Sequence, residues 1–163
     1  EERPAEVANR IIPGHWEGDL LMGSRNASAI GTLVERTTRM TFIVKLNNQD
    51  ASTIRKAFGE EFRILPKGLK RTLTYDQGGE MAQHKLFTKQ TKIAVYFAHP
   101  HSPWERGTNE NTNALLRQYF PKGTDFSKIS RTRLKEVQDE LNERPRKTLG
   151  FYTPYEKFSE LLH

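Results

Sequence analysis

The sequence predicts an α/β protein in which five strands form one mixed sheet with helices on both faces. Two observations carry this prediction. Three strand-like segments follow one another with only short polar joints, at residues 16–22, 28–35 and 40–46. After them, helical and strand-like segments alternate up to residue 97, and two more helices follow. Strands joined by short turns pair antiparallel and strands joined through a helix pair in parallel, so the sheet should contain both kinds of pair.

The first three strands are expected because these segments are rich in aliphatic residues, Thr and Phe, which suit a pleated, half-buried surface. In the third segment every second residue from Met40 to Leu46 is apolar, and Ile43 makes the opposite side partly apolar as well. Apolar residues on both sides of a strand indicate burial on both sides. Both faces of this strand should therefore be covered.

A helix is expected after Asp50, a residue type that caps helix starts. Its apolar residues recur at the spacing of one helical face and are Ile54, Ala57, Phe58, Phe62 and Leu65. Pro66 then ends the helix. A strand over residues 70–75, a short helix over 84–90 and a strand over 93–97 follow, which gives the crossovers that parallel strands need.

Two further helices complete the pattern. The segment from Ser102 to Glu105 has the residues of a helix start, and Gly107 delays the regular helix by a residue. Its apolar side consists of Leu115, Leu116, Tyr119 and Phe120. The last helix, from about residue 131 to 143, ends before Pro145. It carries one apolar stripe, made of Leu134, Val137 and Leu141. This order of strands and helices is the ribonuclease H-like arrangement.

Length and charge narrow the class of protein. The 163 residues fit one domain with a single core. We expect the polar residues 1–14 to be a linker-like lead-in and residues 15–163 to form the domain. The chain does not begin with Met, so we expect it to be a domain of a longer protein. Its 26 Lys and Arg against 20 Asp and Glu give +6, and such a surplus favours polyanionic partners.

Several classes of site are excluded by the sequence. The chain has no cysteine, so it has no disulfide, zinc–thiolate site or cysteine nucleophile. It also lacks a nucleophile elbow and a glycine-rich phosphate loop with its Lys. No apolar run approaches the roughly 20 residues that span a bilayer, and the charged start is unlike a signal peptide. We therefore expect a soluble, cytoplasmic protein that does not bind membranes.

Three carboxylates occupy positions that the expected sheet could bring together. Asp19 lies within the first strand among apolar residues, Asp76 directly follows the fourth strand, and Glu110 lies near a helix start. If strands one and four are neighbours, the helix can bring Glu110 over the same edge of the sheet. Mg²⁺ prefers oxygen ligands, and enzymes acting on nucleic acids hold two such ions with a few carboxylates and the substrate phosphate. The trio therefore predicts a metal site for phosphoryl chemistry on a nucleic acid.

Each of these acids also has a structural interpretation. Asp19 could pair with Arg36 or Lys45, Asp76 could be an ordinary turn residue, and Glu110 could be favoured by the helix dipole. Glu17 lies on the same face of its strand as Asp19 and could tune the site. The remaining candidate ligands are Glu80, Glu105, His99 and His101. Only the combination of the three acids favours a metal site over these separate interpretations.

Four segments carry a resemblance to a known family. They are residues 15–20 (HWEGDL), 32–36 (TLVER), 102–125, which begins SPWERGTNENTN, and 141–150 (LNERPRKTLG). On these segments the chain resembles the catalytic domain of insertion sequence thirty family transposases, within the Asp-Asp-Glu transposase and retroviral integrase group. The likeness covers nearly the whole chain.

The resemblance implies a chemistry and a set of partners. Asp19, Asp76 and Glu110 would be the catalytic and metal-binding residues, with 33 residues between the last two. Two Mg²⁺ ions, or Mn²⁺ in their place, would support hydrolysis of a DNA strand at a transposon end and attack of the freed 3′-hydroxyl on another phosphodiester. The implied partners are transposon-end and target DNA, with self-association on DNA, at the bacterial nucleoid. Gln77 stands where the family usually has Asn, and the family's N-terminal DNA-binding region is absent from this chain.

Side chains around the Glu110 helix are candidates for contact with DNA, through phosphates or by stacking on a base. They are Trp104, Arg106, Asn111, Arg117 and Lys122. Trp104 could equally anchor the core, and Arg117 and Lys122 could belong to a solvated face. Two other functions remain open: a nuclease or Holliday-junction resolvase that cuts without joining, and a non-catalytic DNA-binding module derived from a transposase.

Overall fold

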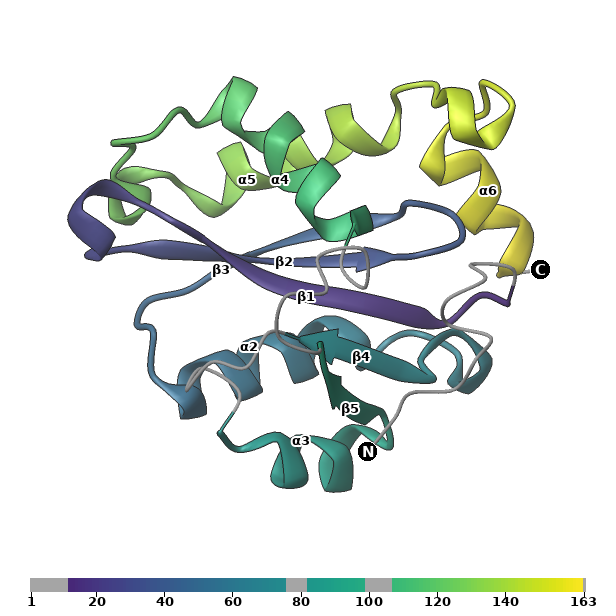
Figure 1. Cartoon of the computed structure of the whole chain (residues 1–163), viewed down its shortest axis with the longest axis horizontal. Coiled ribbons are helices and arrows are strands. Elements are labelled where there is room, and N and C mark those ends of the chain that lie inside the picture. The colour runs from purple at the N-terminus through teal and green to yellow at the C-terminus, as the bar shows by residue number, and fades with distance from the viewer. Residues whose placement is uncertain (1–11, 76–81, 99–106, 163) are drawn as a thin grey trace.

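The computed structural model describes residues 12–75, 82–98 and 107–162 (Figure 1). Its strands are β1 (His15–Met22), β2 (Ala29–Glu35), β3 (Thr41–Lys45), β4 (Thr72–Tyr75) and β5 (Ala94–Phe97). Its α-helices are α2 (Ala51–Phe62), α3 (His84–Thr91), α4 (Gly107–Tyr119), α5 (Arg131–Asn142) and α6 (Pro154–Leu161). Short 3-10 helices are η1 (Ser24–Asn26), η2 (Lys67–Leu69), η5 (Phe126–Lys128) and η6 (Lys147–Leu149).

The five strands form one mixed sheet, as the sequence predicted, and their order in it is β3-β2-β1-β4-β5. β1 pairs antiparallel with β2 and β2 antiparallel with β3, whereas β4 is parallel to both β1 and β5. Strands one and four are therefore neighbours. The pairing places Asp19 opposite Thr32 and Trp16 beside Leu73.

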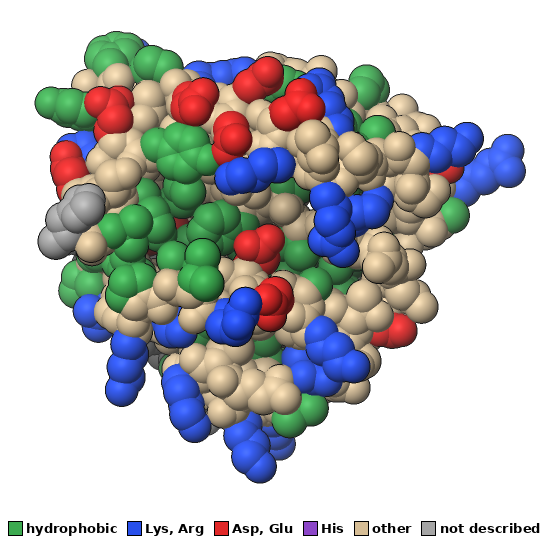
Figure 2. Space-filling view, turned by 180° about the vertical axis from the view of Figure 1, so that it is seen from behind, with side chains coloured by type: hydrophobic (Ala, Val, Ile, Leu, Met, Phe, Trp, Pro, Cys, Tyr) green, Lys and Arg blue, Asp and Glu red, His purple; other side chains and the backbone are tan. Residues whose placement is uncertain are grey.

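Helices cover both faces of the sheet. In Figure 1, α4 and α5 lie above the sheet, and α2 and α3 lie below it. Seen from behind, the end of the molecule that carries α3 presents several Lys and Arg side chains (Figure 2). None of the helices in the described ranges is long and apolar enough to cross a membrane.

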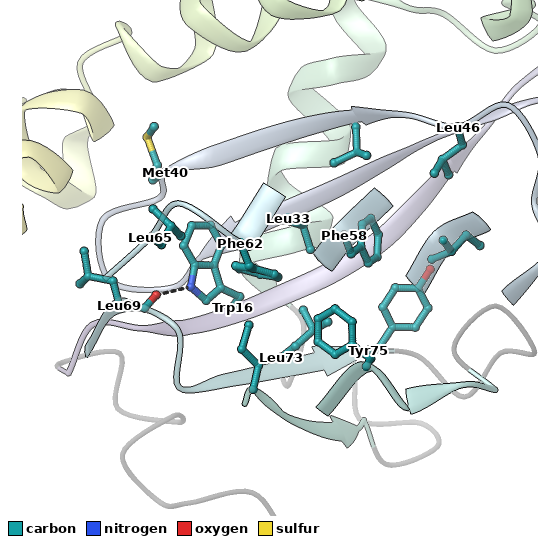
Figure 3. Close-up of a cluster of buried hydrophobic side chains, with 14 of the residues drawn as sticks. Trp16, Leu33, Met40, Leu46, Phe58, Phe62, Leu65, Leu69, Leu73 and Tyr75 are labelled. Carbon is teal, nitrogen blue, oxygen red and sulfur yellow. Dashed lines mark hydrogen bonds between the residues drawn. The ribbon is translucent and has the colours of Figure 1, made fainter. Parts of the chain in front are cut away.

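The core on the α2 side is built around Trp16 (Figure 3). This side chain is fully buried and its indole N–H donates to the Leu69 carbonyl oxygen at 2.8 Å. The indole stacks on Phe42 and meets Phe62 edge-on, with ring centroids 5.3 and 5.2 Å apart. The apolar face predicted for the first helix lies in this core, because Ile54, Phe58, Phe62 and Leu65 are all buried in it.

A second core fills the space between the sheet, α4 and α5. It contains the predicted apolar residues of both helices, namely Leu116, Phe120, Leu134, Val137 and Leu141, with Leu115 and Tyr119 packed against them. Ile43 of β3 also points into this core, whereas Val44 lies in the first. The prediction that both faces of the third strand are covered is therefore confirmed.

The edge of the sheet at β3 is closed by amide side chains of α5. Gln138 Oε1 accepts from the Ile43 N–H at 2.9 Å, and Asn142 Oδ1 accepts from the Thr41 N–H at 3.0 Å. Asn142 Nδ2 also donates to the Thr41 carbonyl oxygen at 2.8 Å. These bonds satisfy backbone groups that would otherwise offer a pairing edge to another chain.

α5 ends before Pro145, as predicted, but the prediction that it is the chain's last helix is wrong, because α6 follows it. Thr153 caps α6 and forms a capping box with Glu156, and Pro154 occupies the first turn. The sequence Thr-Pro-Tyr-Glu therefore contained a complete helix-start signal. The Tyr155 hydroxyl donates to Asp139 and Phe158 is buried in the Trp16 core, which fixes α6 to the rest of the domain.

Candidate active site

The candidate site lies on the face of the sheet that α4 covers. Along β1, side chains alternate between the two faces. Trp16 and Leu20 contribute to the core under α2, and Leu21 contributes to the core under α4. Glu17 and Asp19 share the α4 face with Leu21, as predicted. Both carboxylates contact residues of α4.

Asp19 is held by hydrogen bonds to both of its carboxylate oxygens. Oδ1 accepts from the Leu20 N–H at 2.8 Å, and Oδ2 accepts from Asn113 Nδ2 at 3.0 Å. The two bases considered as ion-pair partners make other contacts. Arg36 lies 3.3 Å from Glu17, and Lys45 donates to the carbonyl oxygens of the loop before α5. The Asp19 carboxylate is thus oriented by an amide of the Glu110 helix.

Glu110 lies in the first turn of α4 and its side chain is exposed. It precedes Asn113 by three residues, so the two side chains lie about 60° apart around the helix axis. The helix starts at Gly107, close to the predicted start. Glu110 thus lies one helical turn before Asn113, the residue through which α4 contacts Asp19. An acid in the first turn also suits the helix dipole, so the structural interpretation of Glu110 is compatible with this placement.

The first turn of α4 is held by hydrogen bonds to a buried carboxylate of β1 and to a partly buried Arg side chain. Glu17 is fully buried, and its Oε1 accepts from the Asn109 N–H at 2.9 Å. Asn109 Nδ2 in turn donates to the Glu17 carbonyl oxygen at 3.3 Å and to Thr32 Oγ1 at 3.2 Å. Arg39 donates to the Thr108 hydroxyl from the β2–β3 turn. The backbone that carries Glu110 is therefore anchored on both sides of its first turn.

The sequence predictions missed this anchoring network. Its members are Thr32, Arg39, Asn109 and Asn113, with Glu17 acting as more than a neighbour of Asp19. One signal was present: Asn109 and Asn113 are four residues apart, so they share one helical face, and two amides on a face turned toward a sheet need polar partners there.

The structure places one predicted site residue, Asp19, against the helix that carries another, Glu110. Asp76 lies outside the described residues, directly after the end of β4 beside β1. The other predicted residues outside the described ranges are Glu80, His99, His101, Trp104, Glu105 and Arg106. Among the residues that are described, no group of three metal-ligating side chains comes together. The complete trio therefore remains a prediction.

The predicted DNA contacts on α4 differ in their surroundings. Asn111 and Lys122 are exposed. Arg117 is half-buried and donates to the carbonyl oxygens of Met22 at 2.9 Å and Phe120 at 3.4 Å. Arg117 therefore has a structural role, because its side chain joins the end of α4 to the end of β1.

Gly18, between the two carboxylates of β1, provides a stability prediction. A β-carbon there would lie 2.9 Å from Tyr75 Cδ2 and 3.1 Å from Leu73 Cδ1, closer than packed atoms tolerate. We expect Gly18→Ala to lower the free energy of unfolding by about 1–3 kcal/mol, measured by urea denaturation. Gly68→Ala is the control, because a β-carbon there meets nothing within 4 Å. Equal stabilities for Gly18→Ala and the unchanged chain would contradict the packing described here.

A comparison with protein families identifies this chain's relatives. The family described as "Integrase core domain" matches residues 10–103, which include β1 and β4. The chain belongs to the integrase core domain family. This integrase core is 50% identical over 160 residues to the transposase for insertion sequence element IS1086 of Cupriavidus metallidurans. It is also 50% identical over 155 residues to the transposase InsI for insertion sequence element IS30A of Escherichia coli. The resemblance to the insertion sequence thirty family is therefore confirmed.

The matches cover most of this integrase core but less than half of the two relatives. They span 98% and 95% of the chain, but 47% and 40% of the IS1086 and IS30A transposases. Among solved structures, the catalytic core domain of BIV integrase has a TM-score of 0.68 at 18% identity, over 92% of this chain and 96% of that one. The predicted ribonuclease H-like fold is thus confirmed by a structural relative of low sequence identity.

Proposed function

We propose that this chain is the catalytic domain of a DNA transposase that cuts a strand at transposon ends and joins the freed 3′-hydroxyl to target DNA. The observation that carries the proposal is the 3.0 Å hydrogen bond from Asn113, on the helix of Glu110, to the Asp19 carboxylate. This bond supports the assignment of Asp19 and Glu110 to one site, in a chain that belongs to the integrase core domain family. The names of the relatives, which are transposases, support the same function.

The donor set of this patch fits Mg²⁺. Carboxylate oxygens are the ligands this hard cation prefers, and Asp19, Asp76 and Glu110 would hold two ions, with Mn²⁺ as a substitute. Asn113 fits the part of a second group that orients a metal-binding carboxylate through a hydrogen bond. When bound, the ions supply neutralisation of the phosphate charge and an activated water or 3′-hydroxyl.

The chain's own residues orient this site and bind the substrate. Glu17 and Arg39 fix the first turn of α4, so the Glu110 side chain starts from a fixed backbone. The exposed Asn111 and Lys122 are proposed to bind phosphates of the DNA held there. An Arg guanidinium has five N–H donors, so Arg117 can contact a phosphate while keeping its two carbonyl bonds.

Trp104 and Arg106 complete the proposed DNA contacts, by base stacking and phosphate binding respectively. Joining two transposon ends to one target requires two copies of such a site, so we also propose that the protein self-associates on DNA. The proposed location is the bacterial cytoplasm, at the nucleoid.

One assay distinguishes this proposal from its alternatives. The chain is incubated with Mg²⁺, a short duplex with a free 3′-hydroxyl and a supercoiled plasmid, and the products are resolved on denaturing gels. Covalent joining of the duplex to the plasmid supports the transposase proposal. Nicked or linear plasmid without joining would instead indicate a nuclease or resolvase. Unchanged DNA on the denaturing gel, together with a retarded band on a native gel of the same mixture, would indicate a non-catalytic binding module.

A further inference from the structure

Most of the net positive charge of this chain comes from one quarter of its sequence. Residues 51–92 contain nine Lys and Arg against four Asp and Glu, a net charge of +5 out of +6 for the whole chain. We name this region the α2–α3 basic surface. Its cationic residues are Arg55, Lys56, Arg63, Lys67, Lys70, Arg71, Lys85, Lys89 and Lys92. One of the four acids is Asp76, which the proposed function assigns to metal binding.

A hollow of about 470 Å³ lies on this surface, at α2 and α3. Four of its lining side chains are cationic, namely Arg55, Lys56, Arg63 and Lys70. Within the described part of the chain, the one acidic residue that lines the hollow is Glu60, which lies 2.9 Å from Arg63. The charge around the hollow is therefore positive even with that ion pair formed.

Arg55 is held in place at this hollow by neutral groups. Its side chain is only 9% exposed, and it donates from Nε to Gln83 Oε1 at 2.8 Å and from Nη1 to Gln90 Oε1 at 2.6 Å. Both acceptors are amide oxygens, so these bonds orient the guanidinium without neutralising its charge. An oriented cation loses less side-chain entropy on binding an anion than a free one does.

The lysines of α3 extend the charge away from the hollow as a row. Lys85 and Lys89 are four residues apart and Lys92 follows at the end of the helix, all three exposed. Lys85 and Lys89 lie on one side of α3, about 6 Å apart along the axis at the 1.5 Å rise per residue of a helix. Lys92 lies just past them, at the left-handed C-cap of α3. A row of point charges at this spacing suits a repeating polyanion better than a single acidic group.

This surface lies across the sheet from Asp19. Phe58 of α2 and Phe87 of α3 pack into the Trp16 core, whereas Asp19 faces α4. Figure 1 shows α2 and α3 below the sheet and α4 above it, and Figure 2 shows Lys and Arg side chains around the α3 end. The sheet therefore separates the α2–α3 basic surface from Asp19. A DNA strand bound at Asp19 cannot also lie in the hollow.

We infer that the α2–α3 basic surface binds the phosphate backbone of duplex DNA, independently of sequence, at a segment other than the one being cut. This inference rests on the proposed function, because a transposase must hold DNA beyond the reacting phosphodiester and must hold two DNA molecules during joining. DNA is favoured over an acidic protein because the charge forms an extended row and the relatives act on DNA elements.

The test measures binding of the whole chain to a random-sequence duplex by fluorescence anisotropy in EDTA, over a series of salt concentrations. The hollow variant is Lys56→Gln/Arg63→Gln/Lys70→Gln, and the matched control is Lys128→Gln/Arg133→Gln/Lys147→Gln, three exposed cations on the α5 side. We expect the hollow variant to lose about tenfold or more in affinity at moderate salt. Its slope of log affinity against log salt should fall by about 2–3, at roughly 0.9 per lost phosphate contact.

The control should lose less than about threefold in affinity and keep its slope, because its charges lie away from the row. A second variant, Lys85→Gln/Lys89→Gln/Lys92→Gln, should lose affinity and salt dependence as the hollow variant does. Its three substituted side chains are exposed, so the substitutions should not disturb folding, and misfolding would not explain a loss of binding. Equal losses of DNA affinity in the hollow and control variants would overturn the inference, because binding would then depend on the total charge of the chain and not on this surface. Unchanged DNA binding in both basic-surface variants would also overturn the inference. Binding of polyglutamate is measured in the same way, and variants that lose polyglutamate binding but keep DNA binding would assign the surface to an acidic protein.

A failure of this inference can be distinguished from a failure of the proposed function. The binding assay contains no metal, so an inactive catalytic site leaves its result unchanged. Conversely, the hollow variant should still join DNA in Mg²⁺ at saturating DNA concentration, because none of its substitutions touches Asp19 or α4.

Discussion

Asp19→Asn is expected to abolish Mg²⁺-dependent strand joining while the chain stays folded. The change removes one negative charge from the proposed metal site with almost no change in shape. Loss of a metal-binding carboxylate forfeits several kcal/mol of transition-state stabilisation, so activity should fall by about 10³-fold or more. Stability should fall by only about 1 kcal/mol, because Asp19 is partly exposed and Asn113 can present its carbonyl oxygen to the new amide. Rates of joining and urea denaturation curves measure the two effects.

Asp50→Asn is the matched control for this substitution. Asp50 caps α2 by accepting from the Thr53 N–H at 2.7 Å, on the opposite side of the sheet. Asn caps helices about as well as Asp, so both joining and stability should stay close to those of the unchanged chain. An Asp19→Asn chain that joins DNA within a few fold of the unchanged rate would refute the assignment of Asp19.

Glu17→Gln should lower the stability of the chain and raise the Mg²⁺ concentration that joining requires. Glu17 and Arg36 form an ion pair at 3.3 Å in which both side chains are at most 1% exposed. The substitution removes the carboxylate that pairs with the buried Arg36 charge, so the free energy of unfolding should fall by about 3–5 kcal/mol. The loosened first turn of α4 should misplace Glu110 and raise the Mg²⁺ concentration for half-maximal joining by about tenfold or more.

Glu35→Gln distinguishes this positioning role from a loss of stability alone. Glu35 is also fully buried, on the neighbouring strand, and accepts from the N–H groups of Gly14 at 3.2 Å and Thr38 at 2.8 Å. None of these groups belongs to α4. The control should therefore lose stability without a change in its Mg²⁺ dependence. The same shift in Mg²⁺ dependence for both variants would show that Glu17 acts only through stability.

The sequence predicted the sheet well because its strands carry strong local signals. The alternation from Met40 to Leu46 and the cap at Asp50 are each readable within a few residues, and both were confirmed. The α6 helix was missed although its capping box is equally local. Its start signal, a capping box with Pro in the first turn, is as strong as the Asp50 cap of α2.

The support of the candidate site could not be predicted in the same way. Asn109 and Asn113 bond to groups 77 to 94 residues away in sequence, on β1 and β2. Which strand residue meets which helix residue depends on the register of β1 against β2 and on how α4 packs across them. Spacing within the helix shows only that the two amides share a face. Glu17 was placed on the correct face of β1 by alternation, but its partners follow from the tertiary structure alone.

The central claim is that Asp19 and Glu110 belong to one metal site, and manganese soaks of crystals of this chain test it most directly. Mn²⁺ replaces Mg²⁺ at oxygen-ligand sites and gives an anomalous diffraction signal. A manganese peak is expected in contact with the Asp19 carboxylate and bordered by Glu110, with Asn113 still bonded to Asp19. Manganese bound only elsewhere on the molecule, with Asp19 carrying no metal and Glu110 directed away from it, would contradict the account.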